Sequence, residues 1–317
     1  MAAPDVVPLA SIVRSGFTEG HHRGRLVILA ADGSVEYSLG DADAPVLPRS
    51  SNKPMQAVAM LEQGLDASGR LLALAAASHA GEPFHVAAVR RILASGGLAE
   101  DALLCPADWP LGADAKLDLV RGGGSPAPVA MNCSGKHASM LLTCVRNSWP
   151  TDDYLNPGHP LQQAARVAVA RLAEEDVAYD AIDGCGAPLH GISLTGLARA
   201  FRNFVLAAPS SPERRVADAM RAYPEYVSGS KRLDTELMRE IPGLLTKGGA
   251  EGVQALALAD GRALAFKIDD GEDHRARGPI TVAALRRMGV EAEVLARYAQ
   301  TPLLGGGVQV GAIRAVI

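Results

Sequence analysis

The chain has 317 residues and a formal net charge of −4, with acidic and basic residues interspersed along it. Hydrophobic residues make up 48% and charged residues 21%, as in an ordinary globular enzyme. Aromatic residues make up only 4%, which argues against a site built on stacked bases. Because the sequence also has no basic stripe, we expect no nucleic-acid partner.

No stretch approaches the roughly 18 consecutive apolar residues of a membrane-spanning helix, and residues 1–16 lack a basic segment before their short apolar run. We therefore expect a cytoplasmic protein without a membrane partner. The cysteines are too few for a disulfide scaffold in a chain of this length. In a reduced compartment they are free to be core residues or metal ligands. They are Cys105, Cys133, Cys144 and Cys185.

Patterns typical of β-strands gather near the two ends of the chain. Two pairs of apolar runs are each joined by Asp-Gly, a dipeptide typical of tight hairpin turns. One pair lies near the N-terminus and the other near the C-terminus, and the last residues form a further run with strand character. The predicted strands cover residues 24–30, 34–39, 252–259, 262–268 and 307–317.

Apolar residues at helical spacing dominate the middle of the chain. The predicted helices cover residues 71–78, 85–95, 136–147, 161–174, 193–206, 212–223, 280–288 and 291–299. We therefore expect an α+β protein, with one antiparallel sheet formed from both chain termini and a helical region inserted between them. The predicted organisation is a single domain over 1–317, with a sheet part at 1–48 and 247–317 and a helical part at 49–246.

The first candidate for chemistry is the stretch RSSNKP at 49–54, which precedes apolar residues at helical spacing. Pro54 is tolerated only in the first turn of a helix, so we expect a helix to begin here. Residues three apart are neighbours on a helix, so the Ser50 hydroxyl and the Lys53 amine can meet. An uncharged lysine can take the proton of a serine and make it a nucleophile. The same serine could equally be an ordinary helix cap.

A second group of polar residues follows the predicted helix at 71–78. It contains Ser78 and His79, then Gly81 and Glu82. Alone, this pattern is typical of a helix C-terminus with Gly81 in the left-handed cap position. The side chains are nevertheless an unusually polar set for such a place.

Two further motifs contain cysteine. The stretch NCSGKH at 132–137 precedes a helix, and small residues at a helix start can bind an anion or an oxyanion. Within it Cys133 and Lys136 are three apart, so a thiolate and an amine could point to one spot. Cys185 lies between two glycines, where a purely structural role is also open. Two cysteines do not make a zinc site, and a third ligand would have to be Lys136 as a neutral amine, or His137.

The fifth motif is TKGGAEG at 246–252, immediately before a predicted strand. It is similar to the Lys-Thr-Gly strand of serine acyl enzymes, whose lysine faces a Ser-x-x-Lys pair. Glycines after the lysine would let a substrate approach closely. The alternative is a flexible glycine loop.

Taken together, the five motifs resemble the rhizobial-type L-asparaginases, also called class 3 or asparaginase II-like. The resemblance runs from about residue 49 to 270, and five ordered motifs are far more specific than one. It implies a fold similar to that of serine β-lactamases and glutaminases. It also implies two Ser–Lys pairs, Ser50 with Lys53 and Ser78 with Lys247, although Lys267 is a second candidate for the latter pair.

The activity implied by the resemblance is hydrolysis of L-asparagine to L-aspartate and ammonia through an acyl-enzyme. A zinc ion (Zn2+) would lie beside the nucleophile, held by Cys133, Lys136 and Cys185. Among the substrate-binding candidates, Arg49 would bind the α-carboxylate and Asp183 the α-amino group. The full candidate set for substrate binding is Arg49, Asp183, His137, Gly249, Ala250 and Glu251.

Two other classes of function are compatible with the same residues. A glutaminase or another serine acyl hydrolase of the β-lactamase-like fold would use the same Ser–Lys pair. A non-catalytic zinc or amino-acid-binding protein would bind metal and ligand without releasing ammonia. We expect a homodimer, the commonest symmetric assembly.

Overall fold

The computed structural model describes residues 5–317, so the first four residues of the predicted 1–317 domain lie outside the described part. The chain divides into two compact units. The sheet unit consists of the residues up to Ser51, Ile192–Leu206 and Glu236–Ile317. The helical unit consists of Asn52–Gly191 and Ala207–Thr235.

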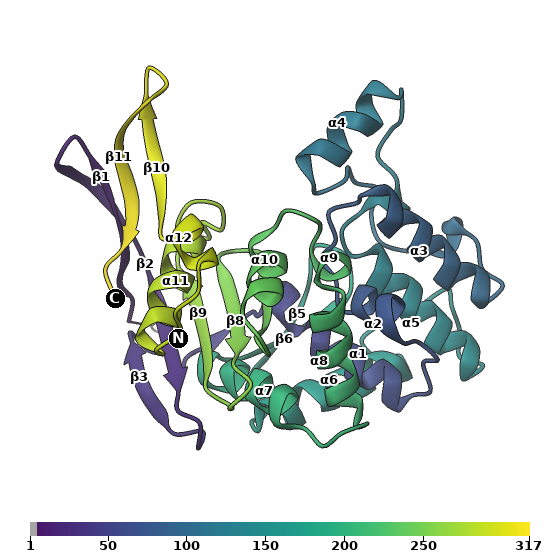
Figure 1. Ribbon diagram of the computed structural model, residues 1–317. Coiled ribbons are helices and arrows are strands. Elements are labelled where there is room, and N and C mark those ends of the chain that lie inside the picture. Colours follow the sequence, from purple (N-terminus) through teal and green to yellow (C-terminus); the bar gives the residue numbers. More distant parts are fainter. Residues whose placement is uncertain (1–4) are drawn as a thin grey trace. The chain divides into compact units, whose positions relative to one another are not determined.

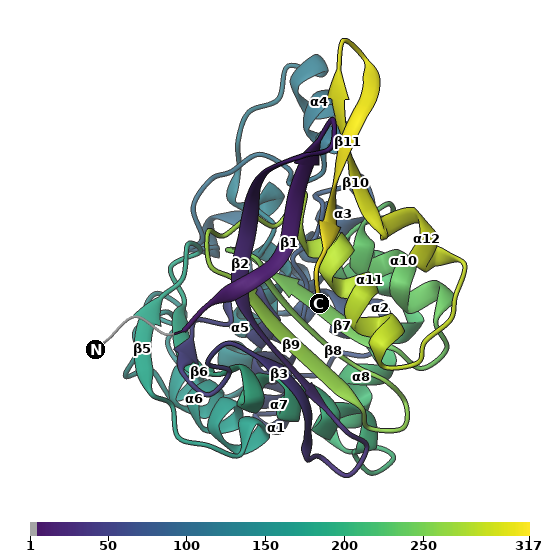
Figure 2. The same ribbon diagram turned by 90° about the vertical axis from the view of Figure 1, so that its left-hand side faces the viewer.

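The sheet unit contains an antiparallel sheet in the order β10-β11-β1-β2-β9-β8-β7, with β3 also paired to β2. Strands from opposite ends of the chain lie side by side in it: β1, purple in Figure 2, pairs with the yellow strand β11 on one side and with β2 on the other. The predicted α+β class and the antiparallel sheet built from both termini are confirmed. The strands are β1 (Val7–Arg14), β2 (Phe17–Leu29), β3 (Val35–Leu39), β7 (Leu245–Gly249), β8 (Val253–Ala257), β9 (Ala263–Ile268), β10 (Gln300–Gly305) and β11 (Val308–Ala315).

Both predicted hairpins form. β2 pairs with β3 around Gly33, and β8 pairs with β9 around Gly261. These glycines have φ of +91° and +93°, in the left-handed region that the tight turns require. The motif at 246–252 does not simply precede a strand, because its first residues form β7, a fully buried edge strand paired to β8.

The helix α7 (Leu194–Leu206) packs against β2, β8 and β9. Its buried apolar residues recur at three- and four-residue spacing, which gives the helix one strongly apolar face. The predicted division placed this segment with the helical part, but the structure includes it in the sheet unit. The sheet unit also contains α11 (Arg277–Arg287), which contacts β1, β8, β10 and β11, and α12 (Val294–Tyr298).

The helical unit is built around α1 (Lys53–Glu62), labelled in Figure 1. Residues 53–61 of this helix are all buried. Helices α5, α6 and α8 pack around α1. The helices of this unit are α1, α2 (Gly69–Ala75), α3 (Pro83–Ser95), α4 (Ala113–Arg121), α5 (Ser134–Arg146), α6 (Pro160–Ala173), α8 (Pro212–Ala222) and α9 (Pro224–Val227). The segment α10 (Leu233–Glu240) continues from this unit into the sheet unit.

A small sheet accompanies these helices. β5 (Tyr179–Ile182) pairs with β6 (Pro188–Ser193) as a hairpin, and the turn between them contains Cys185. The last two residues of β6 belong to the sheet unit, where they pair with β4 (Pro45–Val46).

The expected helix cap at Gly81 is wrong. α2 ends at Ala75, and Gly81 instead comes directly before Glu82, the N-cap residue of α3. Gly81 has φ of +76°, and a Cβ atom there would lie 2.7 Å from Cβ of Pro110. The glycine is therefore required by its backbone conformation and by close packing, although it caps no helix.

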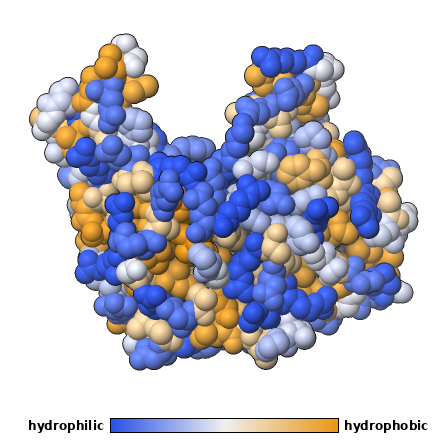
Figure 3. Space-filling model, in the orientation of Figure 1, coloured by the Kyte–Doolittle hydropathy of each residue, from blue (hydrophilic) through white to orange (hydrophobic). Residues whose placement is uncertain are grey.

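The surface is mixed in character. On the face shown in Figure 3, hydrophilic and hydrophobic residues are interspersed. Within residues 5–317, no helix combines the length and the apolar character needed to cross a membrane. All four cysteines are free thiols and are buried.

Candidate active site

Lys53 is the first residue of α1 and is completely buried. Its Nζ atom donates to the carbonyl of Ala77 at 2.7 Å and to Oγ of Ser78 at 2.9 Å. It also lies 3.1 Å from Sγ of Cys133. The helical unit therefore brings three of the predicted site residues into direct contact around a single buried amine.

The loop containing Ser78 is held by backbone hydrogen bonds rather than by a helix. The amide of Ser78 donates to the carbonyl of Val227, and the amide of His79 donates to that of Asn132. These bonds tie the loop after α2 to two distant segments, which places the Ser78 hydroxyl against Lys53. Sequence spacing gave no sign of this contact, because residues 53 and 78 are joined only by tertiary structure.

A second cluster contains the two cysteines of the predicted zinc site. Cys133 precedes the first residue of α5, and Lys136 lies in the first turn of that helix. The Nζ atom of Lys136 is 3.2 Å from Sγ of Cys185, and both residues are buried. A hydrogen bond between the two thiols raises the pKa of Cys133 and lowers the pKa of Cys185.

The charges of this cluster follow from those shifts. The directions of these shifts favour the proton on Cys133 and the negative charge on Cys185. Burial acts to lower the pKa of Lys136, but the neighbouring Cys185 and Cys133 outweigh burial and raise that pKa. These directions favour a negative charge on Cys185 beside a positive charge on Lys136.

The donor set of this cluster fits a zinc ion. Two sulfur atoms and one nitrogen converge in a buried place, and zinc prefers such ligands. Within residues 5–317, no group of three His, Cys, Asp or Glu side chains could hold a metal, so the third donor would be Lys136. That amine must lose its proton to bind a metal. His137, the other candidate, has its Nδ1 atom 2.8 Å from the hydroxyl of Tyr154.

The sheet unit contains the other predicted residues. The turn η1 (Arg49–Asn52) begins with Arg49, which has φ of +51°. Ser51 is completely buried and donates its hydroxyl to the carbonyl of Lys247 at 2.9 Å. Ser50 is half-buried, and its hydroxyl makes no hydrogen bond within residues 5–317. The two neighbouring serines therefore differ: Ser51 is bound to the sheet, whereas Ser50 retains a hydroxyl available for chemistry.

β7 lies close to this turn at its glycines. Lys247 is buried, and its Nζ atom donates to the carbonyl of Gly248 at 2.8 Å. A Cβ atom on Gly249 would lie 2.6 Å from the carbonyl oxygen of Pro48 and 3.2 Å from Oγ of Ser51. Only glycine at position 249 allows the serine turn to approach the strand so closely.

Replacement of Gly249 with alanine should therefore push the turn away from β7. We expect a loss of about 1–3 kcal/mol in the free energy of unfolding, as for other overpacked sites, measured by urea denaturation. Gly20→Ala is the matched control on β2, because a Cβ atom there meets only Cδ1 of Ile12 at 3.9 Å. Equal stability losses in the two variants would contradict the close approach.

Arg49 forms an ion pair with Glu251 at 3.4 Å. Glu251 has φ of +60° and a side chain that is 61% exposed, so this pair lies at the surface.

Arg277 of α11 was not anticipated from the sequence. It is buried, and its Nη1 atom lies 3.5 Å from the carbonyl of Gly249, where it supports β7.

The predicted residues therefore fall into two groups. One group comprises the residues of the helical unit: Lys53, Ser78, Cys133, Lys136, His137, Asp183 and Cys185. The other comprises those of the sheet unit: Arg49, Ser50, Lys247, Gly249, Ala250 and Glu251. The pairing of Ser78 with Lys247 joins residues of different units and stays a prediction. Lys267, the alternative lysine, donates a hydrogen bond from its Nζ atom to the carbonyl of Ile268 on β9.

Two histidines near Ser78 form a contact that the sequence did not suggest. The rings of His79 and His85 stack with centroids 5.0 Å apart, and Nε2 of His79 lies 2.8 Å from Oγ of Ser134. Burial lowers the pKa of His79 well below its usual value of 6.5, and the neighbouring His85 and Lys53 lower it further. Burial also lowers the pKa of His85. Both rings are therefore neutral near pH 7.

These histidines should make stability depend on pH. Below pH 6.5 the unfolded chain binds protons that the folded protein does not, so the free energy of unfolding falls as the pH is lowered. Each such histidine lowers the free energy of unfolding by up to about 1.4 kcal/mol for each unit by which the pH falls. In urea titrations from neutral to mildly acidic pH, His79→Gln should show a shallower pH dependence. The exposed His274→Gln is the control, and an unchanged slope in the His79 variant would contradict this assignment.

The sequence comparison identifies the class of protein to which this chain belongs. The sequence matches the model of a family described as L-asparaginase II over residues 10–315. The chain belongs to the L-asparaginase II family, as the motifs indicate, and is therefore an amidohydrolase.

No curated protein matches the sequence. Similar solved structures include a β-lactamase from Mycobacterium bovis, with a TM-score of 0.45, 14% identity, and coverage of 84% of this chain and 95% of that one. The protein Mglu gives a TM-score of 0.38 and 15% identity, covering 84% of this chain and 60% of that one. EstCE1, a hydrolase with promiscuous acyltransferase activity, gives a TM-score of 0.40 and 12% identity, with coverage of 78% of this chain and 88% of that one. These likenesses are too distant to say anything of activity.

Proposed function

We propose that the protein hydrolyses L-asparagine to L-aspartate and ammonia through an acyl-enzyme ester on Ser50. Membership of the L-asparaginase II family supports the substrate class. The observation that carries the proposal is the environment of Lys53. This buried amine, three residues after Ser50, contacts a second serine hydroxyl, that of Ser78.

In the first half of the reaction, Lys53 in its uncharged form takes the proton of the Ser50 hydroxyl. The Ser50 oxygen attacks the carbon of the side-chain amide, and backbone amides near the serine turn stabilise the oxyanion. As the C–N bond breaks, the proton returns from Lys53 through the Ser78 hydroxyl to the leaving nitrogen. The contact of 2.9 Å between Lys53 and Ser78 suits this transfer.

In the second half, water attacks the ester carbonyl while Lys53 takes a proton from the water. The ester bond breaks, L-aspartate leaves, and Ser50 recovers its proton. We propose Lys247 as the second partner of Ser78, and Lys53 as the base in both halves.

For the substrate, we propose that Arg49 binds the α-carboxylate and Asp183 the α-amino group. Arg49 already holds a carboxylate, that of Glu251, so the substrate would compete with Glu251 for the guanidinium. The other proposed substrate contacts are those of His137, Gly249, Ala250 and Glu251.

We further propose that Cys133, Lys136 and Cys185 hold a zinc ion. When bound, the ion would order the loop that leads into α5 and help to hold the substrate's α-carboxylate or α-amino group. The residues themselves supply a buried, electron-rich cluster beside Lys53.

Replacement of Cys133 with serine is expected to remove one metal ligand and to weaken substrate binding rather than the chemistry. We expect the metal content per chain to fall and KM for L-asparagine to rise, with kcat within a few-fold of the wild type. Elemental analysis and steady-state kinetics measure these quantities. Cys144→Ser, which alters a buried cysteine of α5 outside the cluster, is the control. A fall in kcat at unchanged KM would contradict this role.

The proposed function is tested by measuring ammonia release from L-asparagine and from L-glutamine. The two substrates differ by one methylene, which a pocket can discriminate by about 1–3 kcal/mol. A higher kcat/KM for L-asparagine supports the proposal. A preference for L-glutamine would favour the glutaminase alternative, and release from neither would favour a binding protein. The homodimer and the cytoplasmic location stay predictions.

A further inference from the structure

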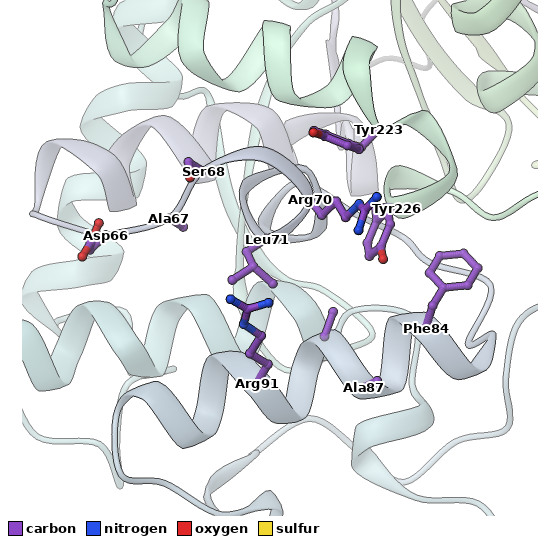
Figure 4. Close-up of a pocket in the computed structure, with 11 residues that line it drawn as sticks. Asp66, Ala67, Ser68, Arg70, Leu71, Phe84, Ala87, Arg91, Tyr223 and Tyr226 are labelled. Carbon is purple, nitrogen blue, oxygen red and sulfur yellow. The ribbon is translucent and has the colours of Figure 1, made fainter.

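The helical unit contains a pocket of about 520 Å³ that none of the proposed catalytic residues lines. Three segments form it: the connection from α1 to α2 with the first turn of α2, one face of α3, and the junction of α8 with α9 (Figure 4). Its volume is that of an ordinary small-molecule site.

One wall of the pocket is a stripe along α3. Phe84, Ala87, Ala88 and Arg91 follow the spacing of residues that share a helix face. Because the two alanines have small side chains, they leave space above the helix between the side chains of Phe84 and Arg91. The stripe therefore has an aromatic residue at one end and a cationic residue at the other, with only small side chains between them.

The aromatic end is completed by two tyrosines. The ring of Tyr226 lies 4.8 Å from that of Phe84, between centroids. The guanidinium of Arg70 lies 5.5 Å from the ring centroid of Tyr223 and 5.9 Å from that of Tyr226. Figure 4 shows the Arg70 side chain directed to these rings, which hold it at the pocket.

The pocket carries positive charge. Within residues 5–317, the side chains of Arg70 and Arg91 make no hydrogen bond and no ion pair, and Arg70 lies over the two tyrosine rings. Among the lining residues, Asp66 is acidic, but it is paired with Arg146 at 3.4 Å. In Figure 4 Asp66 also lies at the opposite end of the pocket from Tyr226. Two guanidinium groups are thus left to meet an anion.

We propose that this pocket binds a mononucleotide-like ligand, a flat ring system that carries a phosphate group. Two arginines without ionic partners match the charge of a phosphate group, which is close to −2 at neutral pH. A guanidinium group can also donate two parallel hydrogen bonds to two oxygens of one phosphate. The ring of Phe84, at the aromatic end of the stripe, provides a face for a flat heterocycle. The site is separate from the asparagine site and adds a second ligand to the protein.

The test measures binding of adenosine 5′-monophosphate to the whole protein by isothermal titration calorimetry, without L-asparagine. We expect Arg91→Gln to weaken binding by roughly tenfold, the loss of a charge-assisted hydrogen bond, and Arg70→Gln to do the same. Arg90→Gln is the matched control, because Arg90 is the preceding residue of α3 but pairs with Glu100 at 2.6 Å. Phe84→Leu should weaken binding of the nucleotide but not of inorganic phosphate, because Phe84 lines the pocket without holding either arginine.

Binding that needs both parts of the ligand supports the proposal: adenosine alone and phosphate alone should each bind more weakly than the nucleotide. Equal losses in Arg91→Gln and Arg90→Gln would overturn it, as would no binding at millimolar nucleotide. Arg70 and Arg91 are both exposed, so their variants should fold, and thermal melting checks this. Because Ser50→Ala should bind the nucleotide as the wild type does, failure here is distinguishable from failure of the proposed hydrolysis.

Discussion

Replacement of Ser50 with alanine is expected to lower kcat for L-asparagine by a factor on the order of 10⁴ or more, with the fold intact. The variant lacks the oxygen that forms the ester, so no other group in the proposed reaction can take its place. Ser50 is half-buried and its hydroxyl makes no hydrogen bond within residues 5–317, so removal of the hydroxyl should hardly change stability. Steady-state ammonia release and urea denaturation measure the two effects.

Ser51→Ala is the matched control, because it removes a hydroxyl from the adjacent residue. Ser51 donates to the carbonyl of Lys247 in a buried place, so its loss should cost about 1 kcal/mol of stability. Its kcat should stay within a few-fold of the wild type. The opposite result, with activity lost in the Ser51 variant and retained in the Ser50 variant, would exchange the roles that we give the two serines.

Replacement of Lys53 with alanine should have the second largest effect. The proposal gives this residue the proton transfers of both half-reactions, and loss of a general base usually lowers the rate by about 10²–10⁴-fold. Arginine at position 53 should be equally inactive, because a guanidinium does not give up its proton. Small primary amines added to Lys53→Ala should restore part of kcat, which a purely structural role would not predict.

Lys231→Ala is the control for this experiment. Lys231 belongs to the same unit, but its side chain is 83% exposed and pairs with Asp114 at the surface. We expect full activity in this variant. If Lys53→Arg retained activity, or if amines gave no rescue in a folded Lys53→Ala protein, Lys53 would not be the base.

The sequence indicated the strands whose signals are local. Asp-Gly turns flanked by apolar runs predicted the β2–β3 and β8–β9 hairpins, because a tight turn fixes the pairing of the strands beside it. β1 and β10 were not predicted. Their apolar residues do not alternate cleanly with polar ones, and each becomes a strand by pairing with β11 from the end of the chain. The motif at 246–252 was compared with the Lys-Thr-Gly strand, with a glycine loop as the alternative, and its first residues do form a strand, β7, which is buried against β8.

Candidate pairs for the site could be proposed from the sequence where one segment contributes both residues, and these pairings stay predictions. The spacing of Ser50 and Lys53 at a helix start, and of Cys133 and Lys136, could be recognised as motifs. The contact of Lys53 with Ser78 depends on how the loop after α2 meets other segments, which no local pattern encodes. The support of β7 by Arg277 was missed for the same reason.

Hydroxylamine trapping tests the central claim, an acyl-enzyme on Ser50, most directly. Hydroxylamine competes with water for an ester, so turnover of L-asparagine in its presence should yield β-aspartyl hydroxamate alongside L-aspartate. We predict that the hydroxamate share rises with the hydroxylamine concentration in the wild type and in Ser51→Ala. We predict none above the non-enzymatic rate in Ser50→Ala. Ammonia release without hydroxamate at any hydroxylamine concentration, or hydroxamate formation by Ser50→Ala, would contradict the account.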